Sequence, residues 1–182
     1  MIAYRFGPVI IFALMLSLSA QAQTIVRGSD YPPGEATPAN GSFSINFPIS
    51  YRDVQYKGAE ARIGDAKDAA VTVHMLTGVD REGLRFSATE TPLQKPVPPI
   101  DTFLAISKKR PDAVASDVRH EQKDDLEILS FSLTEPDQEY FFRVVRSKTT
   151  GYVLAVQFPS ELRNKAIGMK DDFFGSFKII RH

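Results

Sequence analysis

The sequence predicts an α/β fold in which an antiparallel β-sheet is covered by helices on both faces, an α/β/α sandwich. Residues 139–158 form a hairpin pattern that is apolar on both sides, so each face of the sheet needs a cover. Short polar turns join the successive strand patterns, which is typical of an antiparallel meander. Helical patterns precede and follow the last strands, and we expect them to provide the two covers.

Alternation within the hairpin places apolar side chains on both faces of its first arm. Phe141 and Val145 share one face, because successive side chains in a strand point to opposite sides. The other face receives Tyr140, Phe142 and Val144. The second arm repeats this arrangement, and we therefore expect the hairpin at the centre of the sheet.

The N-terminal residues have the features of a targeting segment. Arg5 supplies a positive charge, residues 8–18 are largely apolar, and Ala20 and Ala22 provide a small-x-small cleavage signal. We expect a signal peptide over residues 1–22 and no transmembrane anchor after cleavage, because a span needs about 20 apolar residues. The protein is therefore expected to be exported.

Composition excludes several kinds of chemistry. The chain has no cysteine, which rules out disulfides, iron–sulfur clusters and thiol catalysis. Its 22 basic and 22 acidic residues balance and are scattered, so nothing favours nucleic-acid binding or a polybasic membrane contact. An export signal without cysteine indicates a periplasmic or secreted protein of bacterial rather than eukaryotic type.

Residues 23–41 are polar, contain several prolines and glycines, and show no strand or helix period, so we expect a flexible leader. Residues 42–182 then form a single α/β domain, because roughly 140 residues is the size of one domain. Alternating apolar and polar residues predict six strands before the hairpin. These strands cover residues 42–47, 51–56, 70–77, 84–91, 114–122 and 126–133.

Two helices are expected. The first covers residues 101–110, with Asp101 as its N-cap and Pro111 as its stop. The second covers residues 160–175, and a short extended piece follows over residues 176–180. Its apolar face is formed by residues that recur with helical spacing, namely Leu162, Ala166, Met169 and Phe173.

Three stretches resemble the PsbP-like superfamily, which includes the extrinsic photosystem protein PsbP and the Ran-binding Mog protein. They are residues 41–48 (Gly-Ser-Phe-Ser-Ile-Asn-Phe-Pro), the aromatic hairpin, and residues 172–179 (Asp-Phe-Phe-Gly-Ser-Phe-Lys-Ile). The resemblance implies an antiparallel sheet between helices. It implies no catalytic residues, because this superfamily is mostly known for interaction and assembly modules.

No pattern of catalytic or metal-binding residues is found. His74 and His120 lie on different predicted strands and lack the spacing that places two nitrogens on one metal ion. Nucleophile motifs and phosphate loops are absent as well. The acidic pairs at 124–125 and 171–172 consist of adjacent residues whose side chains point apart. We therefore expect no catalytic residue, no metal and no cofactor.

Arg143 and Arg146 are the two candidate site residues, because each lies in the apolar hairpin and a buried guanidinium needs an anion. Strand alternation predicts that they point to opposite faces. They would bind an anion or a partner's carboxylate. The alternative is pairing with Glu127 or Glu139 on a neighbouring strand, or a position at the sheet edge with the charge in water.

These features favour an exported binding or assembly module that is not an enzyme and acts through protein–protein or envelope contacts. The identity of the partner and the oligomeric state do not follow from the sequence. The alternative is a carrier for a small ligand, with an aromatic-lined cavity beside the sheet. That cavity would be lined by Tyr140, Phe142, Tyr152 and Phe158.

Overall fold

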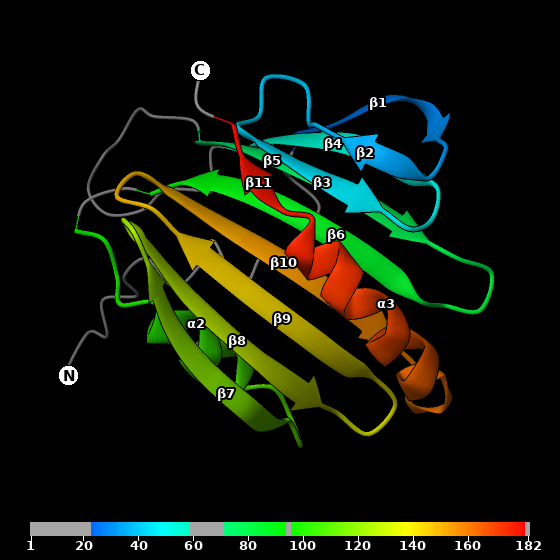
Figure 1. Ribbon diagram of the computed structural model, residues 1–182, viewed down its shortest axis with the longest axis vertical. Helices are drawn as coiled ribbons and strands as arrows, with labels where there is room; N and C mark the ends of the chain where they lie inside the picture. Colours follow the sequence, from blue (N-terminus) through cyan, green and yellow to red (C-terminus); the bar gives the residue numbers. More distant parts are fainter. Residues whose placement is uncertain (1–22, 59–70, 94–95, 181–182) are drawn as a thin grey trace, which may run out of the picture.

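The computed structural model describes residues 23–58, 71–93 and 96–180, and it contains two antiparallel sheets (Figure 1). The large sheet has the strand order β1-β4-β5-β6-β10-β9-β8-β7, and the small sheet has the order β11-β3-β2. The large sheet consists of β1 (Gln23–Tyr31), β4 (Tyr51–Gly58), β5 (Val71–Val79), β6 (Arg85–Pro92), β7 (Val114–Lys123), β8 (Leu126–Thr134), β9 (Glu139–Arg146) and β10 (Thr150–Phe158). The small sheet consists of β2 (Gly34–Ala36), β3 (Phe43–Phe47) and β11 (Lys178–Ile179).

Helical structure is limited to three short elements within the described residues. They are α2 (Asp101–Ser107), the 3-10 helix η1 (Ser160–Leu162) and α3 (Arg163–Gly175). The predicted helix over residues 101–110 ends three residues early. Asp101 lies in its first turn instead of forming a side-chain cap.

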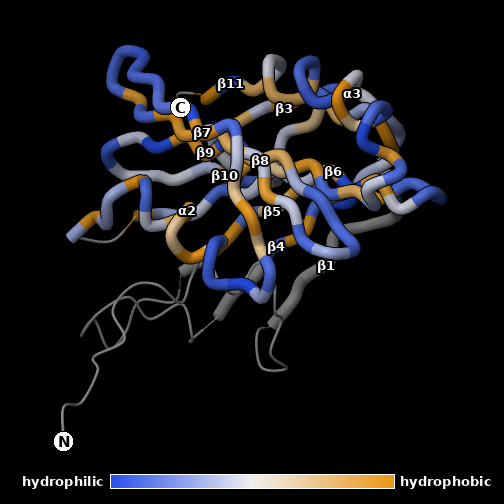
Figure 2. The backbone as a smooth tube through the Cα atoms, turned by 90° about the horizontal axis from the view of Figure 1, so that it is seen from below, coloured by the Kyte–Doolittle hydropathy of each residue, from blue (hydrophilic) through white to orange (hydrophobic). Residues whose placement is uncertain are grey.

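The hairpin prediction is confirmed, because β9 and β10 lie in the interior of the large sheet and pair with each other from Gly151 with Arg146 to Phe158 with Glu139. Strand β9 also pairs with β8, and β10 also pairs with β6. In Figure 2 the hydrophobic colouring gathers along these strands, whereas the connecting turns are mostly hydrophilic. The two-sided apolar pattern therefore marks a strand pair with neighbours on both sides.

One face of the large sheet, here called the α3 face, is covered by α3 and the small sheet (Figure 1). Phe173 of α3 packs edge-on against Phe86 of β6 and Phe47 of β3. The hairpin contributes a row of buried apolar side chains to this core. This row contains Phe141, Val145, Tyr152, Leu154, Val156 and Phe158.

The opposite face, here called the α2 face, is covered by α2 (Figure 1). Phe103 of α2 contacts the rings of Phe131 and Phe142, with centroid distances of 5.9 and 5.4 Å. Tyr140, Val144 and Val153 complete the hairpin's share of this second core. Both faces of the hairpin are therefore buried, each against a different element.

The predicted α/β/α sandwich is wrong, because the fold is mostly β. The described residues form eleven strands, whereas α2 has 7 residues and α3 has 13. Apolar residues on both faces of a strand require a cover, but burial of apolar area does not depend on the kind of element that provides it. On the α3 face, where the sequence predicted a helix as the cover, β3 buries Phe43, Ile45 and Phe47 and shares the cover with α3.

The expected flexible leader over residues 23–41 instead contains β1 and β2. Strand β1 pairs with β4, and β2 pairs with β3, where Ala36 lies opposite Ile45. Pairing with β4 and β3 overrides the turn-rich composition, because strand formation depends strongly on context. The predicted signal peptide, residues 1–22, lies outside the described residues.

Both outer strands of the large sheet contain an irregularity in their pairing. In β7 the register shifts between Ser116 and Arg119, and Asp117 there has a φ of 53°. In β1 the register shifts between Arg27 and Tyr31. Among the described residues, no helix is long and apolar enough to span a membrane.

Candidate binding groove

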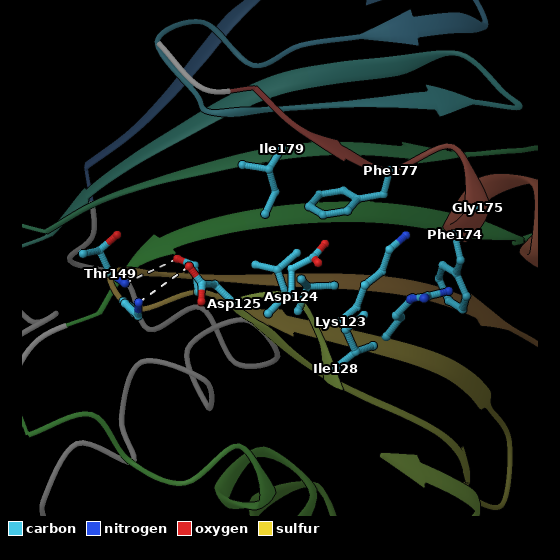
Figure 3. A pocket seen from close by; sticks show the side chains of 14 residues that line it. Lys123, Asp124, Asp125, Ile128, Thr149, Phe174, Gly175, Phe177 and Ile179 are labelled. Atoms are coloured by element: carbon cyan, nitrogen blue, oxygen red, sulfur yellow. Dashed lines mark hydrogen bonds and ion pairs between the residues drawn. The ribbon is translucent and has the colours of Figure 1, made fainter. Parts of the chain in front are cut away.

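A groove of about 510 Å³ lies on the α3 face, at the end of the sheet where the β7–β8 and β9–β10 turns come together (Figure 3). The sheet forms one side of it. The C-terminal end of α3 and the following segment through β11 form the other side. Its volume lies within the range of about 300–1,000 Å³ that is typical of ligand sites.

The groove forms because the cover of the α3 face ends before the sheet does. Ile128 is the residue that β8 contributes to the buried core on this face, and Ser130 and Ser132 follow it on the same face. Beyond them, nine of the ten residues of β7 are exposed, Ala115 being the exception. The outer part of this face is polar and remains open.

Apolar side chains form the floor and one wall of the groove. Ile128 and Val145 form the floor and belong to the core, so they are held rigidly. Figure 3 shows Phe177 and Ile179 reaching toward the sheet from the opposite side, with Phe174 beside them on α3. These three wall residues are partly buried and leave apolar surface for a ligand to cover.

Charged residues of the two turns line the rim. Lys148 Nζ lies 3.6 Å from Asp125 Oδ2, and both side chains are largely exposed. Lys123 and Asp124 form no ion pair within the part of the chain that the structure describes. The rim thus contains one ion pair, Lys148 with Asp125. It also contains two charged residues, Lys123 and Asp124, that have no ion-pair partner among the described residues.

Arg143 lines the groove from β9, on the same face as Val145. Its nearest carboxylate is that of Glu121 on β7, at 3.9 Å between Nη2 and Oε2, which is beyond hydrogen-bond distance. Its side chain is 28% exposed, and it forms no hydrogen bond with any described residue. Arg143 is therefore a partly buried cation whose N–H donors are used by no described residue.

Arg146 lies on the α2 face and has a different environment. Its Nη2 donates to the carboxylate of Glu127, and its Nη1 donates to the backbone carbonyl of Pro98. Its side chain is only 16% exposed. Glu127 and Glu139 were the carboxylates expected to pair with the two arginines if their role is structural, and Arg146 pairs with Glu127. Glu139 instead accepts a hydrogen bond from Arg163 of α3.

The other residues that the sequence analysis considered do not form a reactive centre. His120 Nε2 lies 3.3 Å from Asp101 Oδ1 at an exposed position, and His74 Nδ1 is buried with no hydrogen-bond partner among the described residues. In the described ranges, no group of three His, Asp or Glu side chains could hold a metal ion. The four aromatic residues of the carrier hypothesis lie in the two cores, and none of them lines the groove.

A polar cluster outside the groove connects Ser42, just before β3, to Glu90 and Tyr152 of the large sheet. The Glu90 carboxylate accepts hydrogen bonds from the backbone N–H and the hydroxyl of Ser42, each at 2.8 Å. The Ser42 hydroxyl also lies 2.7 Å from the Tyr152 hydroxyl. Burial raises the pKa of Tyr152 above its ordinary value, so this hydroxyl stays protonated. None of these three residues lines the groove, so the cluster acts as a structural link.

The sequence analysis missed the wall residues. Phe174, Phe177 and Ile179 lie within the stretch 172–179 that was noted for its resemblance, and none of them was predicted to line a site. Phe177 and Ile179 are two residues apart in an extended segment, which places both side chains on one side. That spacing was the available signal, although the surface they face depends on the tertiary fold. No protein-family model matches this chain, and no curated protein matches it.

Proposed function

We propose that the protein is an exported, non-catalytic binding module that receives part of a partner in the groove on the α3 face. The observation that supports this proposal is the combination of a rigid apolar floor, a partly exposed apolar wall and a cationic residue with unused donors. Ligand sites commonly combine an apolar lining with a few polar groups that set orientation.

The groove favours a binding module over the carrier with an aromatic-lined cavity. Tyr140, Phe142, Tyr152 and Phe158 fill the cores and leave the groove to other residues. The charged rim residues lie on solvent-exposed turns, where a macromolecular partner can reach them. Protein and envelope partners both remain within this proposal.

Export is the second component of the proposal. It rests on the charge, apolar run and small-residue signal in residues 1–22, together with the absence of cysteine. N-terminal sequencing of the protein from a periplasmic fraction is expected to start at Gln23. Recovery of unprocessed protein from the cytoplasm alone would contradict export. The relation to the PsbP-like superfamily is likewise a proposal, supported by the three stretches that resemble it.

Two glycines of α3 allow a matched test of the groove. Gly175 lines the groove, whereas Gly168 lies on the same helix outside it, and both are exposed. At either position an added Cβ would meet no heavy atom within 4 Å beyond the local helix backbone. Neither residue has a positive φ, so side chains are tolerated at both sites.

The experiment places the photo-crosslinking residue p-benzoylphenylalanine at position 148, on the exposed rim of the groove, so that the groove itself stays open. Crosslinking in an envelope fraction is expected to give a defined adduct. Free wild-type protein and the matched Gly168→Trp variant are expected to compete for this adduct, whereas Gly175→Trp, with its groove filled, is not. The absence of any adduct, or equal competition by the two tryptophan variants, would contradict the proposed function.

A further inference from the structure

We infer that the groove binds an apolar group bearing a single carboxylate, with the carboxylate at Arg143 and the apolar group between the floor and the wall. This inference rests on the proposed function, because it names the ligand chemistry of that same groove. The shared chemistry has two sources, which are an amphiphilic acid of the envelope and the apolar C-terminal residue of a protein partner.

The guanidinium of Arg143 is the part of the groove that can bind an anion. A guanidinium has five N–H groups in a planar fork that matches a carboxylate in bidentate geometry. None of these donors is used by a described residue, and the Glu121 carboxylate at 3.9 Å lies too far away to accept a hydrogen bond. A partly buried arginine with a free fork beside an apolar floor is a preformed site for an anion.

The charged residues around Arg143 favour a monoanion over a dianion. Lys123 lines the same groove without an ion-pair partner among the described residues, whereas Lys148 is already paired with Asp125. Asp124 on the rim and Glu121 beside Arg143 add negative charge. Like charges repel a dianion such as a phosphate more strongly than a monoanion, so a single carboxylate fits this balance better.

Apolar side chains beside Arg143 provide a site for the apolar part of the ligand. Val145 lies two residues after Arg143 on the same face of β9, and Ile128 lies opposite Val145 on β8. Phe177 and Ile179 face this floor from the other side of the groove (Figure 3). A hydrocarbon chain or an aromatic ring that extends from a carboxylate at Arg143 would therefore lie between two apolar surfaces.

The test uses two pairs of probes with the purified protein. Decanoate is compared with the neutral decanol, and acetyl-Gly-Gly-Phe is compared with its C-terminal amide. Isothermal titration calorimetry is expected to show that at least one acid binds about tenfold or more tightly than its neutral partner, as a charge-assisted bidentate contact provides. Arg143→Gln is expected to abolish this preference, whereas Arg143→Lys retains part of it.

Two further variants separate the inference from the proposed function. Arg119→Gln is the matched control, because Arg119 is exposed on β7 and does not line the groove, and the preference for the acid should persist. Gly175→Trp is expected to abolish binding of every probe. All variants are expected to melt near the wild-type temperature. Differences between their titrations then report binding and not folding.

The outcomes are distinguishable. Binding of decanoate alone supports a free amphiphilic acid as ligand, and binding of the peptide acid alone supports a chain terminus. Equal binding of acid and neutral probes, blocked by Gly175→Trp, overturns the carboxylate inference and leaves the groove as the binding site. Binding of no probe also overturns it, while the crosslinks from position 148 test the proposed function separately.

Discussion

Strand β9 contains two arginines three residues apart, and their hydrogen-bond partners differ between the two faces of the sheet. On the α2 face, Arg146 donates to Glu127 and to the carbonyl of Pro98. On the α3 face, Arg143 has only a carboxylate at 3.9 Å and no hydrogen bond among the described residues. The same residue type in the same strand is thus structural on one face and available for binding on the other.

The two faces also share a feature, because an ion pair connects each helix to a turn of the sheet. On the α2 side, Arg110 beyond the end of α2 pairs with Glu135 in the β8–β9 turn. On the α3 side, Lys165 of α3 pairs with Asp80 in the β5–β6 turn at 2.9 Å. What distinguishes the faces is therefore the surroundings of the arginine, because Glu127 and Pro98 bind Arg146 on the α2 face whereas Arg143 lines the groove on the α3 face.

The largest expected effect comes from a charge placed in either core. Val156→Asp on the α3 face and Phe142→Asp on the α2 face each bury an unpaired carboxylate, because these residues are 0% and 4% exposed. We expect each to lower the free energy of unfolding by about 4 kcal/mol or more and to abolish the cooperative melt in circular dichroism.

The matched control for this prediction is Val114→Asp, at a position of β7 that is 64% exposed. It should change the free energy of unfolding by about 0.5 kcal/mol or less. A cooperative melt near the wild-type temperature in only one of the two core variants would show that the sheet depends on one face alone.

The second prediction tests the two arginines directly. Arg146→Gln should lower the free energy of unfolding by about 2 kcal/mol, because it removes hydrogen bonds to a carboxylate and to the partly buried carbonyl of Pro98. Arg143→Gln should change it by about 0.5 kcal/mol or less, because the long contact with Glu121 contributes little. Urea unfolding measures both values. Equal destabilisation by the two variants would remove the distinction between the faces.

The third prediction concerns the link between α3 and the β5–β6 turn. Burial raises the pKa of Asp80, but hydrogen bonds from Lys165 and from the backbone N–H groups of Leu84 and Glu82 outweigh this effect, so its pKa lies below the ordinary value near 3.8. A lowered pKa in the folded state contributes stability above about pH 4, and this contribution is lost as the pH falls through the folded value.

Asp80→Asn should therefore lower the free energy of unfolding by about 1 kcal/mol at pH 7. The difference from wild type should shrink as the pH falls below about 4, where the wild-type carboxylate becomes protonated. Urea unfolding at several pH values measures this convergence. A difference that stays constant down to pH 3 would show that the charge of Asp80 does not hold α3 in place.

Local patterns predicted much of the sheet. The strands expected over 70–77 and 84–91 correspond to β5 and β6, and the hairpin corresponds to β9 and β10. Each of these segments alternates apolar and polar residues or is apolar on both faces, which is a local signal. Strands β1 and β2 lack such a signal. Their pairing with β4 and β3 is a property of the assembled fold, so composition alone suggested a leader.

The wrong fold class has a related cause. A two-sided apolar hairpin indicates that both faces are buried, but a strand such as β3 provides cover as well as a helix does. For the site, the sequence indicated Arg143 and Arg146 and their opposite directions. It could not indicate which one stays available, because Pro98 and Glu121 reach them only through the tertiary fold.

The irregular pairing in the two outer strands has a consequence for behaviour at high concentration. An open sheet exposes backbone donors and acceptors along its edges, where a strand from another molecule can add and start aggregation. In β7 the shift at Asp117, and in β1 the shift between Arg27 and Tyr31, interrupt the regular row of these groups. Each edge is thereby protected against continuous strand addition, which favours solubility of a domain built around an eight-stranded open sheet.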